Sequence, residues 1–227
     1  MAQYHKIKSI FKRDDNGKFI DEFSIPEFDY LKNNEWTFTE KVDGMNIRII
    51  WDNHTIQFGG KTDKAQLPAH LVNVLNTKFM NTRVLEMFEE KFGDTNVTLY
   101  GEGYGHKIQS GGKYLPNNEV DFVLFDILIG GWWLKREDIE GIADTLWIDI
   151  VPIVGKGRLE QAIQMMRSDN GFTSIWGEFL AEGLVLRPKV ELKDRAGRRI
   201  ITKVKYRDFH KEVGNKTGLF LRNNTTY

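Results

Sequence analysis

The chain has 227 residues, 41% of them hydrophobic, which is enough for one domain with a substantial core. Its net charge is zero, which alone gives no support for nucleic-acid binding, and its lack of cysteine excludes disulfides, thiolate metal sites and a cysteine nucleophile. No apolar run approaches the roughly 18 residues that span a bilayer, so we expect no membrane partner.

The first half of the chain predicts short strands followed by a helical stretch. Residues 4–35 are interpreted as short strands and loops, and three consecutive antiparallel strands follow, at residues 36–41, 46–51 and 55–58. The pair Asp43-Gly44 predicts a hairpin turn between the first two of them. From Pro68 to Phe92 apolar residues recur at helical spacing, and Gly93 provides a helix stop.

The second half alternates between strands and shorter helices. Strands are expected at residues 97–100, 121–129, 132–134, 183–188 and 199–206, and helices at residues 137–145 and 158–168. The stretch 121–129 is nearly all apolar, which predicts a central strand buried on both faces. The pattern indicates an α+β fold with dominant antiparallel strands, and no linker divides the single domain expected over residues 1–227.

Positive charge is concentrated toward the end of the sequence. Residues 183–227 carry twelve Lys or Arg residues and four Asp or Glu residues. Such an asymmetry is typical of a surface that faces a polyanion, and its alternative is a solvated basic tail. Because these cations alternate with Ile, Val and Tyr, we favour basic strands over a disordered tail.

Lys41 stands at the end of a predicted strand, directly before Asp43-Gly44. A lysine held at such a position and partly removed from water can act as a nucleophile once it loses its proton. The alternative is a solvated lysine on a surface hairpin. Lys-x-Asp-Gly is too short to decide between the two, because it often occurs by chance.

Four further features accompany this lysine. Glu102 lies among three glycines, which allow a ligand to approach the backbone closely. Phe125-Asp126-Ile127 lies within the predicted buried strand, and Glu182 precedes another strand. Lys203 and Lys205 share one face of a strand, which is favourable if a polyphosphate lies between them. Each feature has an ordinary structural explanation, but their order and spacing are much less expected by chance.

That order resembles the covalent nucleotidyltransferase superfamily, which contains the ATP-dependent ligases and the mRNA capping enzymes. The matching motifs are Lys41–Gly44, Gly60–Asp63, Tyr100–Glu102, Phe125–Ile127, Glu182–Val185 and Lys203–Lys205. DNA ligases usually carry an arginine two residues after the first motif, and Asn46 at that position is similar to RNA ligases such as phage T4 RNA ligase 2. Lys61 departs from the usual arginine and lacks its bidentate fork.

The resemblance implies a nucleotidyltransferase (ATP-grasp-like) domain of antiparallel sheets flanked by helices, with the nucleotide in the groove between the sheets. It also implies ATP as co-substrate, with Mg²⁺ or Mn²⁺. Lys41 would attack the α-phosphate of ATP to form lysyl-AMP, AMP would pass to a 5′-phosphate, and a 3′-hydroxyl would then seal the strand. No separate C-terminal domain is expected.

The family also implies a role for each matched residue. Phe125 and Val185 would enclose adenine, with Glu40 near the base, and Asn46 would orient the acceptor strand. Gly44 belongs to the nucleotide site, and Lys61 would contact the ribose or a phosphate. The remaining expected contacts are the ribose or a metal-bound water for Glu102, the α-phosphate for Lys203 and Lys205, and the metal ion for Asp43, Glu102 and Glu182.

The leading hypothesis is therefore an ATP-dependent RNA ligase that acts on RNA, including a nicked duplex or an RNA–DNA hybrid. We expect a monomer in the cytoplasm of a bacterium or a virus-infected cell. Asn46 argues against a small ATP-dependent DNA ligase, and the missing C-terminal domain argues against a capping guanylyltransferase. A non-catalytic RNA-binding domain of the same fold is disfavoured by the complete set of Lys41, Glu102, Glu182, Lys203 and Lys205.

Overall fold

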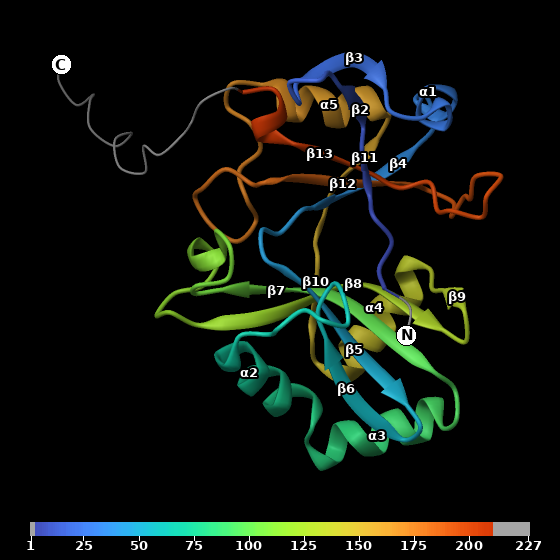
Figure 1. Ribbon diagram of the computed structural model, residues 1–227, viewed down its shortest axis with the longest axis vertical. Helices are drawn as coiled ribbons and strands as arrows, with labels where there is room; N and C mark the ends of the chain where they lie inside the picture. The colour runs from blue at the N-terminus through green and yellow to red at the C-terminus, as the bar shows by residue number, and fades with distance from the viewer. Residues whose placement is uncertain (1–2, 211–227) are drawn as a thin grey trace.

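The computed structural model describes residues 3–210, which form two lobes, each built on one sheet (Figure 1). The upper sheet has the order β1 (Lys8–Ser9), β13 (Thr202–Lys205), β12 (Gly183–Pro188), β4 (Trp36–Glu40), β11 (Ile153–Gly157). The lower sheet has the order β10 (Asp149–Ile150), β8 (Val120–Ile129), β7 (Val97–Gly105), β5 (Met45–Asp52), β6 (Thr55–Gly59), and β9 (Trp132–Trp133) pairs with β8. All pairs except β1–β13 and β10–β8 are antiparallel. The fold is the expected α+β arrangement.

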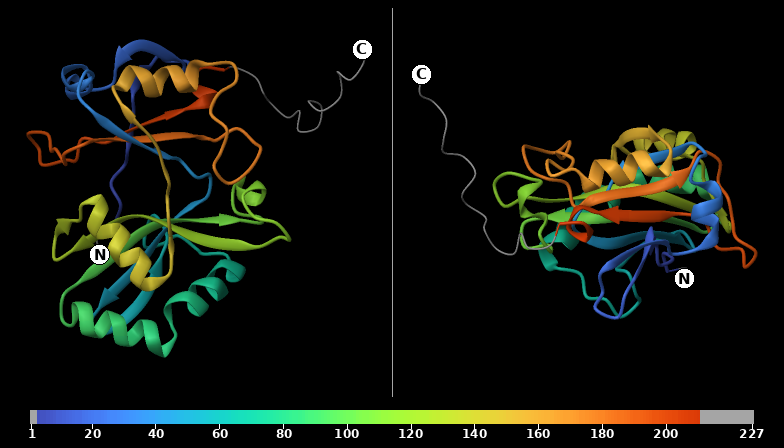
Figure 2. Two further views of the ribbon diagram at one scale, coloured as in Figure 1. Left: turned by 180° about the vertical axis from the view of Figure 1, so that it is seen from behind. Right: turned by 90° about the horizontal axis from the view of Figure 1, so that it is seen from above.

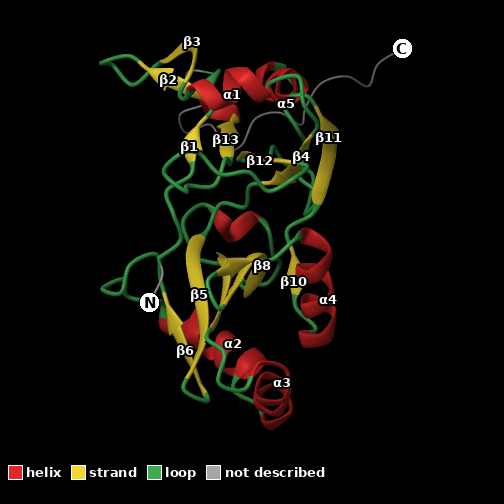
Figure 3. Ribbon diagram, turned by 90° about the vertical axis from the view of Figure 1, so that its right-hand side faces the viewer, coloured by secondary structure: helices red, strands yellow, loops and turns green. Residues whose placement is uncertain are grey.

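The upper lobe buries the outer face of its sheet beneath short elements. These are α1 (Pro26–Leu31), α5 (Leu159–Arg167) and the ribbon of β2 (Phe11–Arg13) and β3 (Phe19–Phe23), all at the top of Figure 3. Leu184 and Leu186 point into this core. Because side chains alternate along a strand, Val185 and Arg187 face the other lobe.

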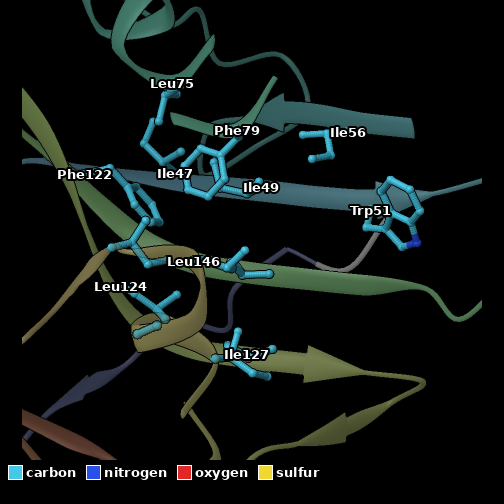
Figure 4. Packing of buried hydrophobic residues seen from close by; sticks show 14 of the residues in the cluster. Ile47, Ile49, Trp51, Ile56, Leu75, Phe79, Phe122, Leu124, Ile127 and Leu146 are labelled. Carbon is cyan, nitrogen blue, oxygen red and sulfur yellow. The ribbon is translucent and has the colours of Figure 1, made fainter. Parts of the chain in front are cut away.

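The lower lobe packs its sheet on α2 (Ala69–Phe79), α3 (Thr82–Phe92) and α4 (Arg136–Leu146). Figure 4 shows Ile47, Ile49 and Trp51 of β5 in this core, together with Phe79 of α2. The alternate position Asn46 therefore faces the upper lobe. No helix within residues 3–210 is long and apolar enough to cross a membrane.

The predicted hairpin at Asp43-Gly44 is wrong, because β4 and β5 belong to different sheets. Glu40 pairs with Leu184 of the upper sheet, whereas Met45 pairs with Gly103 of the lower sheet. A Cβ on Gly44 would lie 2.2 Å from the Gly103 carbonyl oxygen, so only glycine allows this close approach. The segment 41–44 therefore crosses between the lobes, and Figure 2 shows the β10–β11 connection making a second crossing behind it.

Several element bounds also differ from the prediction. The helical stretch 68–92 is two helices, because Asn81 caps the second by accepting a hydrogen bond from the Val84 N–H at 3.0 Å. Helix α1 lies in the region expected to contain only strands and loops, with Pro26 at its first position. Strands β10 and β11 were not predicted. Strand β8 is an interior strand of the lower sheet, between β7 and the two short strands β9 and β10.

Candidate active site

Lys41 lies between the lobes, where the upper sheet ends. Its amine forms an ion pair with one oxygen of Glu182, and the other oxygen of Glu182 pairs with Lys205. Burial alone would raise the pKa of Glu182, but Lys41 and Lys205 outweigh burial and lower it. The three side chains retain only 12–21% of their exposure, so this charged triplet is largely shielded from water.

Two adjoining cavities meet at Lys41. The larger, of about 390 Å³, is bordered by four lysines, Lys6, Lys41, Lys61 and Lys203. The smaller, of about 120 Å³, exposes a mostly apolar surface that includes Ile7, Val42, Phe125, Val151 and Val185, although Lys41, Glu102 and Arg187 also border it. An apolar cavity beside a cationic one matches the two chemical halves of a nucleotide, a flat base and a phosphate chain.

Nine of the twelve predicted site residues border one or both cavities: Glu40, Lys41, Gly44, Asn46, Lys61, Glu102, Phe125, Val185 and Lys203. Asp43, Glu182 and Lys205 border neither cavity. Glu182 and Lys205 are tied to the site through the ion pair with Lys41. Asp43 lies in the crossing segment, where its N–H donates to the Tyr114 hydroxyl at 3.2 Å.

A β-bulge explains how Phe125 reaches the smaller cavity. Tyr100 pairs with Asp126 and Gly101 with Leu124, which leaves Phe125 as the extra residue of β8. Strict alternation would place Phe125 and Asp126 on opposite faces of the sheet. Because of the bulge, both side chains lie on the side of the sheet that faces the upper lobe. Phe125 borders the smaller cavity, and Asp126 contacts arginines of the upper lobe.

Asn46 borders both cavities and has a buried side-chain oxygen that is unpaired among the described residues. Its Oδ1 is buried without a hydrogen-bond partner within residues 3–210. Because a buried polar atom is costly when it is left unpaired, this oxygen is suited to a ligand donor.

Backbone or side-chain contacts near the base are expected of Glu40, and in the structure its side chain is held by the protein. Its carboxylate is buried and accepts hydrogen bonds from the Ser174 hydroxyl at 2.6 Å and the Ile175 N–H at 2.9 Å. Burial nevertheless raises the pKa of Glu40. The side chain therefore anchors the loop that leads to Glu182, and only the rest of the residue is free to contact a ligand.

Glu102 is placed beside the charged triplet, on β7. Burial raises the pKa of Glu102 to about 7, although the nearby charge of Lys41 lowers it. Together with Asp43 and Glu182 it gives a carboxylate set suited to a hard cation. Within residues 3–210 no three acidic or histidine side chains converge tightly enough to form a metal cage. The residues therefore fit a cation held largely through water and phosphate oxygens, as Mg²⁺ commonly is.

Because the pKa of Glu102 is raised, the free energies of unfolding of wild type and of Glu102→Gln should differ by an amount that depends on pH. Chemical denaturation in the presence of EDTA measures this difference. The folded wild type keeps this proton up to about pH 7, whereas the unfolded chain loses it near 4.5. Unfolding is therefore favoured as pH rises through this window, so wild type should lose stability relative to Glu102→Gln between these values. A difference that stays constant with pH would contradict the shift.

Arg48 is a site residue that sequence reasoning missed. Its buried guanidinium donates to the Gly60 carbonyl at 2.8 Å and to Asp63 at 2.7 Å. It therefore fixes the loop that carries Lys61 at the larger cavity. This role could not be predicted from the sequence, because the partners of Arg48 lie in a loop that follows the next strand and no local pattern links them.

A second missed feature is a buried ionic network at Asp126, which joins the lobes. Asp126 accepts from the Tyr4 hydroxyl at 2.8 Å and pairs with Arg199 at 2.5 Å and Arg187 at 3.1 Å. Arg199 also pairs with Glu191. Thus two arginines of the basic segment, Arg187 and Arg199, are committed to an ionic network between the lobes rather than to the outer surface. Residues 211–227 of the segment lie outside the described residues.

Comparison with known proteins identifies relatives of this fold. The sequence profile of the RNA ligase family matches residues 34–205. Among solved structures, Naegleria gruberi RNA ligase with PPi has a TM-score of 0.62 and 21% identity, over 92% of this chain and 64% of that one. A mutant of that enzyme with ATP and Mn has a TM-score of 0.66 and 19% identity, over 93% and 58%. The chain thus spans about three fifths of these structures. A search of curated protein sequences gives no match.

Proposed function

Because the chain belongs to the RNA ligase family, we propose that it is an ATP-dependent ligase that joins 5′-phosphate and 3′-hydroxyl ends of RNA. The observation that carries this proposal is the position of Lys41, at the junction of an apolar cavity and a cationic one. We also propose that residues 1–227 act as one adenylyltransferase domain.

The two cavities suggest how ATP would bind. Adenine fits the smaller cavity, between Phe125 and Val185, and the phosphates extend past Lys41 toward Lys61 and Lys203. ATP is supported as the nucleotide by structures of the Naegleria enzyme that contain ATP with Mn. Asp43, Glu102 and Glu182 would hold a divalent cation through water, and that cation supplies charge neutralisation on the phosphates.

The first chemical step would be attack by the Lys41 amine on the α-phosphate. A nitrogen–phosphorus bond forms, the bond from the α-phosphorus to the bridging oxygen breaks, and pyrophosphate leaves. The amine must first lose a proton to water and give up its ion pair with Glu182, because only the neutral amine is a nucleophile. Glu182 and Lys205 fix the direction of the lysine side chain.

The later steps would use the same centre. An oxygen of an RNA 5′-phosphate attacks the α-phosphorus of lysyl-AMP, and the Lys41 nitrogen leaves and takes up a proton. The 3′-hydroxyl of the second strand then attacks the activated 5′-phosphate and releases AMP. Positioning and charge neutralisation account for most of the acceleration in such transfers.

A panel of nicked duplexes tests the substrate class. We expect sealing that requires ATP and a divalent cation, and that is strong when the strand bearing the 3′-hydroxyl is RNA. Equal sealing of an all-DNA nick would support the DNA ligase alternative. Binding to RNA without sealing any end would support a non-catalytic RNA-binding domain and contradict the proposal.

A further inference from the structure

The first residues that the structure describes cross the mouth of the site as a strap, here defined as Tyr4–Ile7. The ring of Tyr4 packs in the lower lobe, 5.1 Å from that of Tyr100. After the strap, Ser9 of β1 pairs with Lys203 of the upper sheet. Figure 1 shows this dark blue segment passing from the lower lobe to the upper one. Strap residues border both cavities.

The strap brings a third unpaired cation to the larger cavity. Lys6, Lys61 and Lys203 come from three separate segments, and none pairs with a carboxylate of residues 3–210. Two carboxylates lie at this end of the site: Glu102, which borders the cavity and pairs with none of these three lysines, and Glu182, which is bonded through both oxygens to Lys41 and Lys205. Lysines that share a concave surface repel one another, and an anion between them removes this repulsion.

The geometry of phosphoryl transfer determines which anions would bind in the larger cavity during the reaction. In an in-line reaction the incoming and departing groups lie on opposite sides of the phosphorus. When Lys41 attacks ATP, pyrophosphate leaves on the side away from the amine. When the amine later leaves, the attacking 5′-phosphate must come from that same side. One subsite therefore receives the pyrophosphate group first and the RNA 5′-phosphate afterwards.

We propose that Lys6 of the strap, with Lys61 and Lys203, forms this shared phosphate subsite. The assignment rests on the proposed function and adds a substrate-binding residue from outside the recognised motifs. Lys6 stabilises the departing pyrophosphate in the first step and holds the incoming 5′-phosphate in the second. Its loss should therefore slow both steps.

The test compares Lys6→Ala with Lys8→Ala, an exposed lysine two residues further on that borders neither cavity. Two single-turnover rates are measured: formation of lysyl-AMP from ATP, and AMP transfer from isolated lysyl-AMP protein to 5′-phosphorylated RNA. Loss of one charge-assisted contact should slow each step about tenfold in Lys6→Ala. Lys8→Ala should match wild type, and equal thermal melts should show that both variants are folded.

Each other outcome rejects part of the account. If Lys6→Ala matches Lys8→Ala in both steps while wild type is active, the assignment of Lys6 fails and the proposed function stands. If only one step slows, the subsite is not shared. If wild type forms no lysyl-AMP, the proposed function fails, and the assignment of Lys6 fails with it.

Discussion

Replacing Lys41 with alanine is expected to abolish the transfer of AMP from ATP to the protein. Among the residues that the structure describes, no other lysine borders both cavities. Sealing of an RNA that is already adenylylated should remain measurable in this variant, because that step forms no bond to lysine. The measurement uses ATP labelled at the α-phosphate, with denaturing gels for the first step and a pre-adenylylated nick for the last.

Lys41→Arg is the matched control for charge. It retains a cation that can pair with Glu182, but a guanidinium keeps its proton and is no nucleophile. Both variants should therefore lack label. Label on Lys41→Ala at the wild-type level would place the nucleophile elsewhere and contradict the assignment.

Asp126→Ala is expected to destabilise the fold by about 3–5 kcal/mol. The variant would leave Arg187 and Arg199 without the carboxylate that they share between the lobes. It would also remove the acceptor of the Tyr4 hydroxyl. Because Phe125 is adjacent at the bulge, a folded fraction should also show a raised KM for ATP. Urea unfolding curves measure the first effect.

Asp94→Ala serves as the control, because Asp94 is 98% exposed and pairs only with His54 among residues 3–210. Its effect should stay within about 0.5 kcal/mol. Asp126→Asn keeps a hydrogen-bond acceptor and loses the charge, so its loss of stability should be smaller than that of Asp126→Ala and larger than that of Asp94→Ala. If Asp126→Ala and Asp94→Ala unfold at the same urea concentration, the network does not hold the lobes together.

Features encoded by local periodicity could be predicted from the sequence. Alternation correctly put Lys203 and Lys205 on one face, with Val204 between them in the core. The order of the motifs indicated residues that the structure brings to two adjoining cavities. The break at Asn81 also had a sequence signal, because asparagine is a preferred N-cap.

Features that depend on long-range packing could not be predicted in this way. Asp43-Gly44 carries a local hairpin signal, but the chain crosses between sheets because Gly44 packs on Gly103. Period-2 alternation fails at Phe125 because a bulge inserts one residue there. The contact between Tyr4 and Asp126 joins residues that are 122 positions apart, which no local pattern records.

Location of AMP on the protein tests the central claim most directly. Wild-type protein is first treated with pyrophosphate to remove any AMP already attached. It is then incubated with ATP and Mg²⁺ and digested, and the peptide masses are measured by mass spectrometry. The account predicts one added AMP, on the peptide containing Lys41, and its removal when pyrophosphate is added again. AMP on a different residue, or no AMP on folded protein, would contradict it.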